Sequence, residues 1–332
     1  MNTATLSLII PVYNRPNEVD ELLDSLTRQT RTDFEVIIVE DGSQETCKHI
    51  IDTYADRLSV SYYFIPNGGP GNARNYGATK SNSDYLIVLD SDCILPPGYI
   101  DAVHKELLET NADAFGGPDK ASDSFTDVQK AINYSMTSFF TTGGIRGGKK
   151  KMDKFYPRSF NMGIRKSTYE MLEGFSAMRF GEDIDFSIRL YKNGYKVCLF
   201  PSAWVYHKRR TDWRKFFRQV YNSGIARINL YKKYPDSLKI VHLLPAVFTL
   251  GMLFFLIGAF FCRWSLLPLL VYALLICIDS SIQNKSIKIG LLSVIASFVQ
   301  LIGYGTGFLA AVWNRLILRK KEFAAFQKTF YK

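Results

Sequence analysis

Short apolar runs alternate with polar segments of helical pattern over the first 90 residues. The apolar runs are Ser7–Val12, Glu35–Val39, Val60–Ile65 and Tyr85–Leu89, and the helical segments include Asn17–Thr30 and Gln44–Ala55. Strands separated by helices form βαβ units, so the pattern predicts an α/β fold with a mostly parallel sheet and right-handed crossovers. The run Tyr85–Leu89 is apolar throughout, which is typical of a strand buried on both faces.

Polar residues follow three of these predicted strands directly. The three groups are Pro11–Asn14, Glu40–Ser43 and Asp90–Asp92. The carboxyl ends of parallel strands share one edge of a sheet, and open α/β sheets bind their ligands there. The sequence therefore predicts a nucleotide site at this edge. Taken alone, the pair Asp90 and Asp92 is equally well explained as a turn or a helix N-cap.

The pattern changes near residue 207, after which long apolar segments dominate. Ile240–Cys262 has 23 residues and Ile289–Asn314 has 26 without Asp, Glu, Lys or Arg. Each is long enough to cross about 30 Å of hydrocarbon. Between them, Trp264–Ile278 contains Pro268 and ends before Asp279, so it is either a span or a re-entrant segment. Three such segments in tandem favour a membrane region over buried core helices.

Charge is distributed unevenly along the 332 residues, whose net charge is +10. Residues 1–206 hold 22 basic and 27 acidic side chains, whereas residues 207–239 hold 10 and 2, and residues 240–332 hold 9 and 2. The basic excess lies beside the apolar segments. It therefore indicates anionic lipid head groups as the partner and argues against nucleic acid.

The basic residues also bear on orientation. Those before Ile240, the pair Lys285 and Lys288, and the run Arg315–Lys321 each favour the cytoplasmic side. Three full crossings cannot satisfy all three groups, so either one segment does not cross or Gly303–Gly307 breaks the last one. The N-terminus shows no signal-peptide pattern, and five cysteines without metal-type spacing suit a reducing compartment. We expect a multi-pass protein of the cytoplasmic membrane with a cytosolic N-terminal domain.

Aromatic and basic residues alternate from Asp212 to Tyr234. This pattern indicates a pair of helices at the membrane interface, or an amphipathic helix packed on the N-terminal domain. The expected organisation is an α/β domain over residues 1–210, an interfacial segment over 211–239, a transmembrane region of two to three spans over 240–318 and a basic tail over 319–332.

A second acidic cluster, Gly181–Asp183, and a later histidine, His207, complete the candidate chemistry. With Asp90–Asp92 they offer oxygen and imidazole ligands for a divalent cation on a diphosphate, and a separate carboxylate to activate an acceptor hydroxyl. The glycine-rich turn before Arg74 suits phosphate oxygens. The cationic loop Thr141–Lys151 either closes on phosphates or is a solvated loop.

Five motifs, in the same order along the chain, resemble those of family 2 glycosyltransferases. They are Ile9–Asn14, Val39–Ser43, Gly71–Gly77, Asp90–Asp92 and Gly181–Asp185. The resemblance covers about residues 5–210 and implies a Rossmann-like GT-A fold. Glu40 stands where the family usually has a first aspartate. A Gln-x-x-Arg-Trp motif, the signature of processive synthases, is not apparent, since Arg218–Val220 is a poor substitute; single-sugar addition is therefore expected.

The resemblance also implies roles for individual residues. Asp41 is expected to contact the nucleotide base, while Asp92 and His207 hold Mg²⁺ or Mn²⁺. Asp90 is expected either to contact the ribose or to lie in the second shell of the metal. Asp183 is the expected general base of a single inverting displacement. Further donor contacts are expected from Pro11, Tyr13, Asn14, Glu40, Asn72 and Arg74, the last on the diphosphate. Asn161 and Glu182 are expected in the acceptor and sugar pocket.

The function expected from these features is metal-dependent transfer of one sugar. The donor is a nucleotide sugar, with uridine the commonest base in such enzymes, and the acceptor is a hydroxyl of a membrane-associated, lipid-linked glycan in surface glycan assembly. Transfer to polyprenyl phosphate is the second interpretation. A non-catalytic membrane protein with a degenerate nucleotide-sugar domain is the third.

Overall fold

The computed structural model describes residues 4–120, 125–142, 155–208 and 211–322, and the expected loop Thr141–Lys151 lies almost entirely outside them. The described residues form two compact units. Residues 4–120 and 155–208 form the N-terminal unit, and residues 125–142 and 211–322 form the C-terminal unit. The division differs from the expected boundary at residue 210 because residues 125–142 pack with the C-terminal helices.

The N-terminal unit is built on a mostly parallel sheet, as the sequence predicts. Its seven strands within the described residues are β1 (Leu6–Val12), β2 (Phe34–Asp41), β3 (Val60–Ile65), β4 (Tyr85–Leu89), β6 (Ala114–Gly116), β8 (Asn161–Arg165) and β9 (Val197–Leu199). Their order is β3-β2-β1-β4-β8-β6-β9. Strands β3, β2, β1 and β4 are parallel, and β8 runs antiparallel to both of its neighbours.

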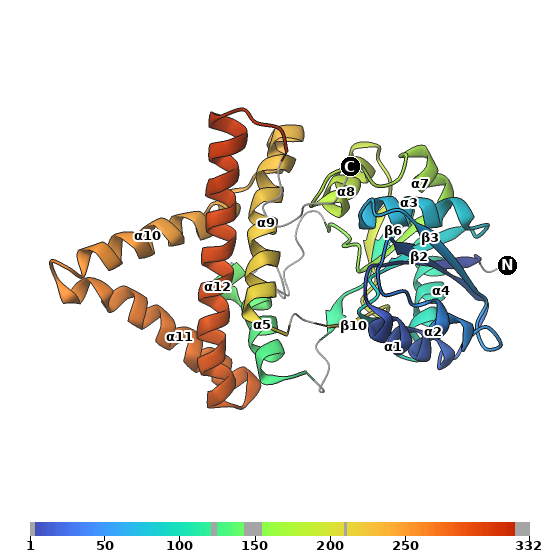
Figure 1. Ribbon diagram of the computed structural model, residues 1–332, viewed down its shortest axis with the longest axis horizontal. Coiled ribbons are helices and arrows are strands. Elements are labelled where there is room, and N and C mark those ends of the chain that lie inside the picture. Colours follow the sequence, from blue (N-terminus) through green and yellow to red (C-terminus); the bar gives the residue numbers. More distant parts are fainter. Residues whose placement is uncertain (1–3, 121–124, 143–154, 209–210, 323–332) are drawn as a thin grey trace. The chain divides into compact units, whose positions relative to one another are not determined.

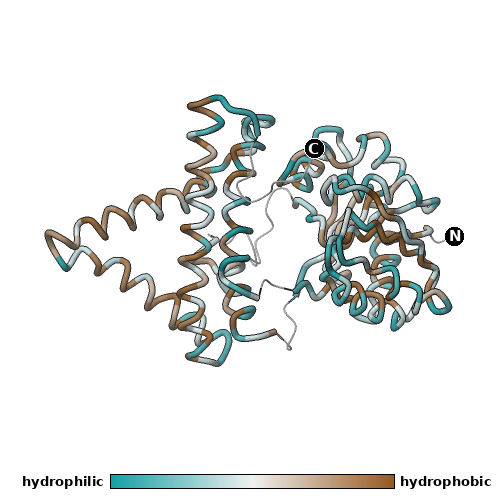
Figure 2. The backbone as a smooth tube through the Cα atoms, viewed as in Figure 1, coloured by the Kyte–Doolittle hydropathy of each residue, from teal (hydrophilic) through white to brown (hydrophobic). Residues whose placement is uncertain are grey.

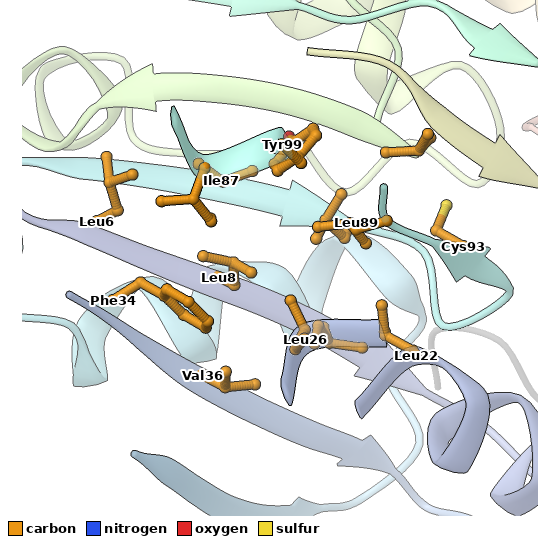
Figure 3. Close-up of a cluster of buried hydrophobic side chains, with 14 of the residues drawn as sticks. Leu6, Leu8, Leu22, Leu26, Phe34, Val36, Ile87, Leu89, Cys93 and Tyr99 are labelled. Atoms are coloured by element: carbon orange, nitrogen blue, oxygen red, sulfur yellow. The ribbon is translucent and has the colours of Figure 1, made fainter. Parts of the chain in front are cut away.

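Helices cover both faces of this sheet. They are α1 (Pro16–Thr27), α2 (Lys48–Asp52), α3 (Pro70–Lys80), α4 (Tyr99–Thr110), α7 (Lys166–Met171) and α8 (Glu182–Lys192). Figure 3 shows one core, in which Leu8 and Ile87 of the sheet lie with Leu26 of α1. Each such side chain contributes about 1.5–3 kcal/mol when fully buried. The core fixes β1 and β4, so the loops after them have a rigid base.

A small second sheet explains the position of His207. It contains β5 (Cys93–Ile94), β10 (Val205–His207) and β7 (Asp119–Lys120) in the order β5-β10-β7. Strand β10 pairs antiparallel with β5 and sets His207 opposite Cys93. The backbone N–H of Lys208 also donates to the Asp92 carbonyl at 3.1 Å. Residues distant in sequence are thereby brought beside the end of β4.

The helix predicted over 44–55 is shorter in the structure, where α2 covers only Lys48–Asp52. Side chains from the loop after β1 and from the end of β2 bind the backbone N–H groups that precede it. The amide oxygen of Asn14 accepts from Gln44 and Glu45, and Glu40 accepts from Cys47. These bonds hold the segment in a loop at the strand edge.

The C-terminal unit is entirely helical among its described residues. Its helices are α5 (Asp127–Thr137), α6 (Phe139–Thr142), α9 (Trp213–Lys233), α10 (Leu244–Gly258), α11 (Leu267–Asn284) and α12 (Ile287–Ala311), and a π-helical turn, Val312–Ile317, follows α12. Figure 1 shows α9 alongside α12, while α10 and α11 form a hairpin joined by the 3₁₀ turn Arg263–Leu266. The expected helix pair over 212–234 is wrong, because α9 is one continuous helix.

The glycines of α12 do not break it. A Cβ on Gly303 would lie 2.6 Å from the Val220 side chain, and one on Gly307 would lie 2.1 Å from the Tyr221 carbonyl oxygen. The glycines therefore allow α9 and α12 to approach closely, as small residues do at helix interfaces. Of the two alternatives for the orientation, the one in which Gly303–Gly307 breaks the last segment is therefore wrong.

Within the part of the chain that the structure describes, two helices are long and apolar enough to cross a membrane. They cover Arg263–Asn284, with 22 residues, and Ile287–Ile317, with 31. The segment expected as the first span forms only the 15-residue α10, whereas the shorter central segment belongs to a full-length helix. Figure 2 shows the hydrophobic character of the α10–α11 hairpin.

Candidate functional site

The end of β4 carries the two aspartates of the first acidic cluster, and β10 brings His207 to them. The His207 Nε2 atom lies 3.1 Å from Asp92 Oδ1 and 3.9 Å from Asp90 Oδ2. The imidazole stacks on Phe160, with ring centroids 4.8 Å apart and an interplanar angle of 20°. Asp92 is buried, whereas Asp90 is partly open to solvent. The packing fixes the orientation of both the ring and the carboxylate.

This group has the donors that a divalent cation needs. Ligand atoms of Asp92, Cys93 and His207 lie within 4.8 Å of one another. Burial raises the pKa of the Cys93 thiol, and its Sγ donates to the Phe160 carbonyl, so the thiol stays protonated and engaged. The carboxylate and the imidazole remain, and both suit Mn²⁺, with carboxylate also suiting Mg²⁺. Asp92 and His207 therefore fit the expected metal.

Arg74 connects the two acidic clusters. Its NH2 group donates to Asp90 and its NH1 group to Glu182, both at 2.9 Å. Burial lowers the pKa of this guanidinium, but the charges of Asp90 and Glu182 outweigh that effect and raise it. Arg74 is the residue expected to face the diphosphate, and in this structure its guanidinium is shared by two carboxylates inside the fold.

The second acidic cluster begins helix α8. Gly181 at its N-cap has a φ of 86°, a conformation that favours glycine. Asp183 accepts from the Ile184 N–H at 2.8 Å and pairs with Arg158 Nε at 2.6 Å. Burial raises the pKa of Glu182, while the Arg74 charge opposes the rise and Asp183 adds to it. The site thus holds two adjacent acids, each beside an arginine.

Two arginines of the site, Arg15 and Arg158, were not predicted from the sequence. Arg15 NH1 lies 2.5 Å from Asp92 Oδ2. Burial lowers the Arg15 pKa, but the charge and hydrogen bond of Asp92, together with the nearby charges of Glu18 and Asp90, raise it overall. Arg158 contacts Asp183 and remains 39% exposed. Arg15 directly follows the polar group Pro11–Asn14 at the end of the first strand, so the sequence could have placed it at the same sheet edge. Nothing in the pattern around Arg158 indicated its partner.

The two acids at the end of β2 organise the loops at the sheet edge. Asp41 accepts from the N–H groups of Gly68 and Gly69 at 2.7 and 2.9 Å, and from the Asn67 amide. Burial raises the Asp41 pKa and those two N–H groups oppose the rise. Glu40 is fully buried, where it accepts from Tyr62 and Cys47. Glu40, which is expected to contact the donor, thus has its hydrogen-bond partners inside the fold.

The remaining expected donor residues differ in exposure. Asn14 has a φ of 52° and ties the loop after β1 to the loop after β2 through Ser43 and Gln44. Tyr13 is 48% exposed beside it, Pro11 is half-buried in β1, and Asn72 is exposed on the first turn of α3. Tyr13 and Asn72 are thus accessible to a ligand at this edge.

Asn161, which is expected in the sugar pocket, lies inside the N-terminal unit. It is fully buried in β8, where its Oδ1 accepts from Tyr99 at 2.6 Å and its Nδ2 donates to the Ala203 carbonyl at 2.8 Å. Both ends of its amide are used in holding the sheet to α4 and to the chain before β10. Its contacts are those of a framework residue.

Comparison with known proteins agrees with this architecture. The model of glycosyl transferase family 2 matches residues 7–172. An uncharacterized glycosyltransferase of Haemophilus influenzae is 45% identical over 218 residues, which cover 62% of this chain and 70% of that protein. The chain belongs to glycosyl transferase family 2. Validoxylamine A glucosyltransferase of Streptomyces hygroscopicus subsp. jinggangensis is 38% identical over 30% of this chain.

Coverage of the curated relatives is uneven. The aligned part spans 24% of the Streptomyces enzyme and 16% of an uncharacterized glycosyltransferase of Rickettsia bellii that is 36% identical. Among solved structures, the mannosyltransferase PcManGT from Pyrobaculum calidifontis, in complex with GDP-Man and Mn²⁺, is similar with a TM-score of 0.61 at 14% identity, covering 95% of this chain and 89% of that one. This similarity shows a shared GT-A fold.

Proposed function

We propose that the protein is an inverting, metal-dependent glycosyltransferase that moves one sugar from a nucleotide-sugar donor to a hydroxyl of a membrane-associated acceptor. The observation that carries the proposal is the Arg74 bridge. It holds Asp90, next to the candidate metal ligand Asp92, and Glu182, next to Asp183, in one site. Family membership supports the reaction class.

The donor is proposed to lie along the carboxyl edge of β1, β2 and β4. Asp41 and the loop that it holds would receive the nucleotide, with Tyr13 and Asn72 accessible beside it. Arg15, next to Asp92, would face the diphosphate oxygens. A divalent cation bound by Asp92 and His207 would offset charge on the leaving diphosphate. Solved structures similar to this chain carry GDP-Man with Mn²⁺ or UDP-GlcNAc, which supports this donor class.

Asp183 is proposed to act as the general base. Its carboxylate would accept the proton of the acceptor hydroxyl as that oxygen attacks the anomeric carbon from the face opposite the diphosphate. The bond between the anomeric carbon and the phosphate oxygen breaks, and the nucleoside diphosphate leaves with the bonding electrons. Arg158 now pairs with Asp183 at 2.6 Å, so it must turn away before the acceptor can reach this carboxylate.

The acceptor is proposed to be a lipid-linked glycan of surface-polysaccharide assembly at the cytoplasmic membrane. The C-terminal unit supports this part, because its described residues include the apolar helix Arg263–Asn284, which is long enough to span a bilayer, and the 23-residue stretch Ile240–Cys262 without Asp, Glu, Lys or Arg. Basic residues flank them, as anionic head groups would require. The N-terminal unit would then work in the cytosol, where nucleotide sugars would be its donors.

A donor panel tests this function. Purified protein in detergent is incubated with individual nucleotide sugars, with Mn²⁺ or Mg²⁺, and with lipid extract as acceptor, and release of nucleoside diphosphate is measured. We expect release from one donor, its loss with a chelator, and normal release by the control Asp84→Asn, whose carboxylate lies at the opposite end of β4. Release that continues unchanged with chelator would contradict metal dependence, and silence across the panel would contradict the transferase.

A further inference from the structure

The position of α5 in the chain restricts the membrane topology, given the membrane association proposed above. Helix α5 comes between β7 and β8, so the chain leaves the N-terminal unit, forms α5 and α6, and returns. An 11-residue helix is about 16 Å long, roughly half of the hydrocarbon thickness. Helix α5 therefore stays on the side of the membrane that holds the N-terminal unit.

Helix α12 is fastened to α5 and α9 along its length. Lys288 at its start pairs with Asp127 of α5 at 2.7 Å, and Arg315 just beyond its end donates to Asn229 of α9 at 2.9 Å. Between these points, the backbones of α9 and α12 approach closely at Gly224 and Gly307. If α12 crossed the bilayer, α9 would have to cross with it.

Helix α9 is too polar for that position. Arg218, Ser223 and Arg227 lie in its middle turns, and the first two are exposed. An arginine at the centre of a spanning helix costs about 2.5–3.5 kcal/mol on insertion scales. Although α12 has the composition of a membrane-spanning helix, 39% of its most apolar 18-residue stretch is buried inside the protein. Its apolar residues partly serve helix packing.

The α10–α11 hairpin has the opposite character. Only 11% of the most apolar 18-residue stretch in the helix Arg263–Asn284 is buried, and Phe254 of α10 is 72% exposed. The tip carries Phe261, Arg263 and Trp264, residue types found where a helix meets a membrane–water interface. At its base, Asp279 of α11 accepts from the Tyr134 hydroxyl of α5 at 2.5 Å, so this carboxylate is held at the end fastened to α5.

We propose that the 23-residue stretch Ile240–Cys262, which contains α10 and has no Asp, Glu, Lys or Arg, crosses the bilayer with α11 as a hairpin. Helices α5, α9 and α12 then lie along the cytoplasmic face against anionic phospholipid head groups. This arrangement places three basic groups on one side: Lys232 to Lys239, Lys285 with Lys288, and Arg315 to Lys321. Only Arg263 reaches the other side. Two crossings thus resolve the conflict that three crossings create under the positive-inside rule.

Cysteine labelling tests the topology in intact spheroplasts of a bacterial host, using the full chain and a membrane-impermeant maleimide. Cys262 at the hairpin tip is exposed, and Cys198 and Cys277 are replaced by serine in every variant to remove partly buried thiols. We expect outside labelling of Cys262 and its loss in Cys262→Ser. A Lys320→Cys change in the Cys262→Ser background should label only after permeabilisation.

Two labelling results would overturn the inference. Outside labelling of Lys320→Cys would mean that α12 crosses, and protection of Cys262 until detergent is added would mean that the hairpin does not reach the far side. Recovery of the wild-type chain in the soluble fraction would overturn the membrane association itself and this inference with it. Donor turnover by the same preparation reports separately on the proposed transferase.

Discussion

At Arg74, one buried guanidinium holds two carboxylates that belong to separate motifs. The side chain is 4% exposed and donates to Asp90 after β4 and to Glu182 at the start of α8. Removing one member of a buried ion pair is more costly than the pair is stabilising, because the remaining charge loses its partner inside the protein. The identity of residue 74 therefore affects both the stability of the unit and the geometry of the site.

Arg74→Met is expected to lower the free energy of unfolding by about 3 kcal/mol near pH 8, by leaving Glu182 charged without its partner. Burial already raises the Glu182 pKa, and losing Arg74 raises it further. A carboxyl whose pKa is higher in the folded than in the unfolded state destabilises the folded protein at high pH, where it is charged. This destabilisation disappears as the pH falls through the folded-state pKa to the unfolded-state pKa. The deficit relative to wild type should therefore shrink as the pH falls toward 5.

Denaturant unfolding at several pH values measures this effect. Arg57→Met removes an exposed arginine from the same unit and serves as the control, with little change expected. Adding Glu182→Gln to Arg74→Met should recover part of the lost stability. An equal deficit at every pH would show that Glu182 is not the group left uncompensated.

Asp92→Asn and His207→Gln are each expected to weaken Mn²⁺ binding at least tenfold, because each removes one of the two donors suited to the ion. Mn²⁺ titration followed by electron paramagnetic resonance gives the dissociation constants. Asp84→Asn, at the other end of β4, should bind like wild type. If all three variants bound Mn²⁺ alike, the ion would have to lie elsewhere.

At the scale of elements, close packing of α9 against α12 explains the glycines of α12. Hydropathy along the sequence correctly indicated an apolar helix, but it does not distinguish residues that face lipid from residues that face another helix. The glycines Gly303 and Gly307 were interpreted as a break for the same reason. Their role depends on Val220 and Tyr221, which lie on a different helix.

Gly307→Ala is expected to destabilise the C-terminal unit by about 1–3 kcal/mol, because a Cβ there would lie 2.1 Å from the Tyr221 carbonyl oxygen. Gly251→Ala on α10 is the matched control, since its Cβ would meet nothing within 4 Å, and alanine favours a helix more than glycine does. Thermal unfolding in detergent compares the two. Equal melting temperatures would argue against the close α9–α12 contact.

For the whole molecule, much of the site was predictable because strand order brings motifs to one edge. Asp90 and Asp92 follow a strand that is apolar throughout, and Glu182 and Asp183 begin a helix of clear pattern. The partners of Arg15, Arg74 and Arg158 were not predictable. Each pairs with an acid far along the chain, and the sequence alone does not show which acid a loop brings within reach.

The grouping of α5 with the C-terminal helices was also missed. Its sequence lies between two strands of the N-terminal unit, and the pattern of apolar residues gives no sign of which unit receives it. The contact with α12 depends on surfaces that become adjacent only in the folded chain, including the pair formed by Asp127 and Lys288.

The central claim is that Asp183 performs the proton transfer at a site where Asp92 helps to hold the donor. Its most direct test compares donor affinity and turnover in Asp183→Asn with those of wild type, using the active donor and its acceptor. We predict a donor dissociation constant within about threefold of wild type and turnover at least about 10²-fold lower, the lower end of what a general base contributes. Near-normal turnover would contradict Asp183 as the base and would favour an acceptor that needs none, such as a polyprenyl phosphate.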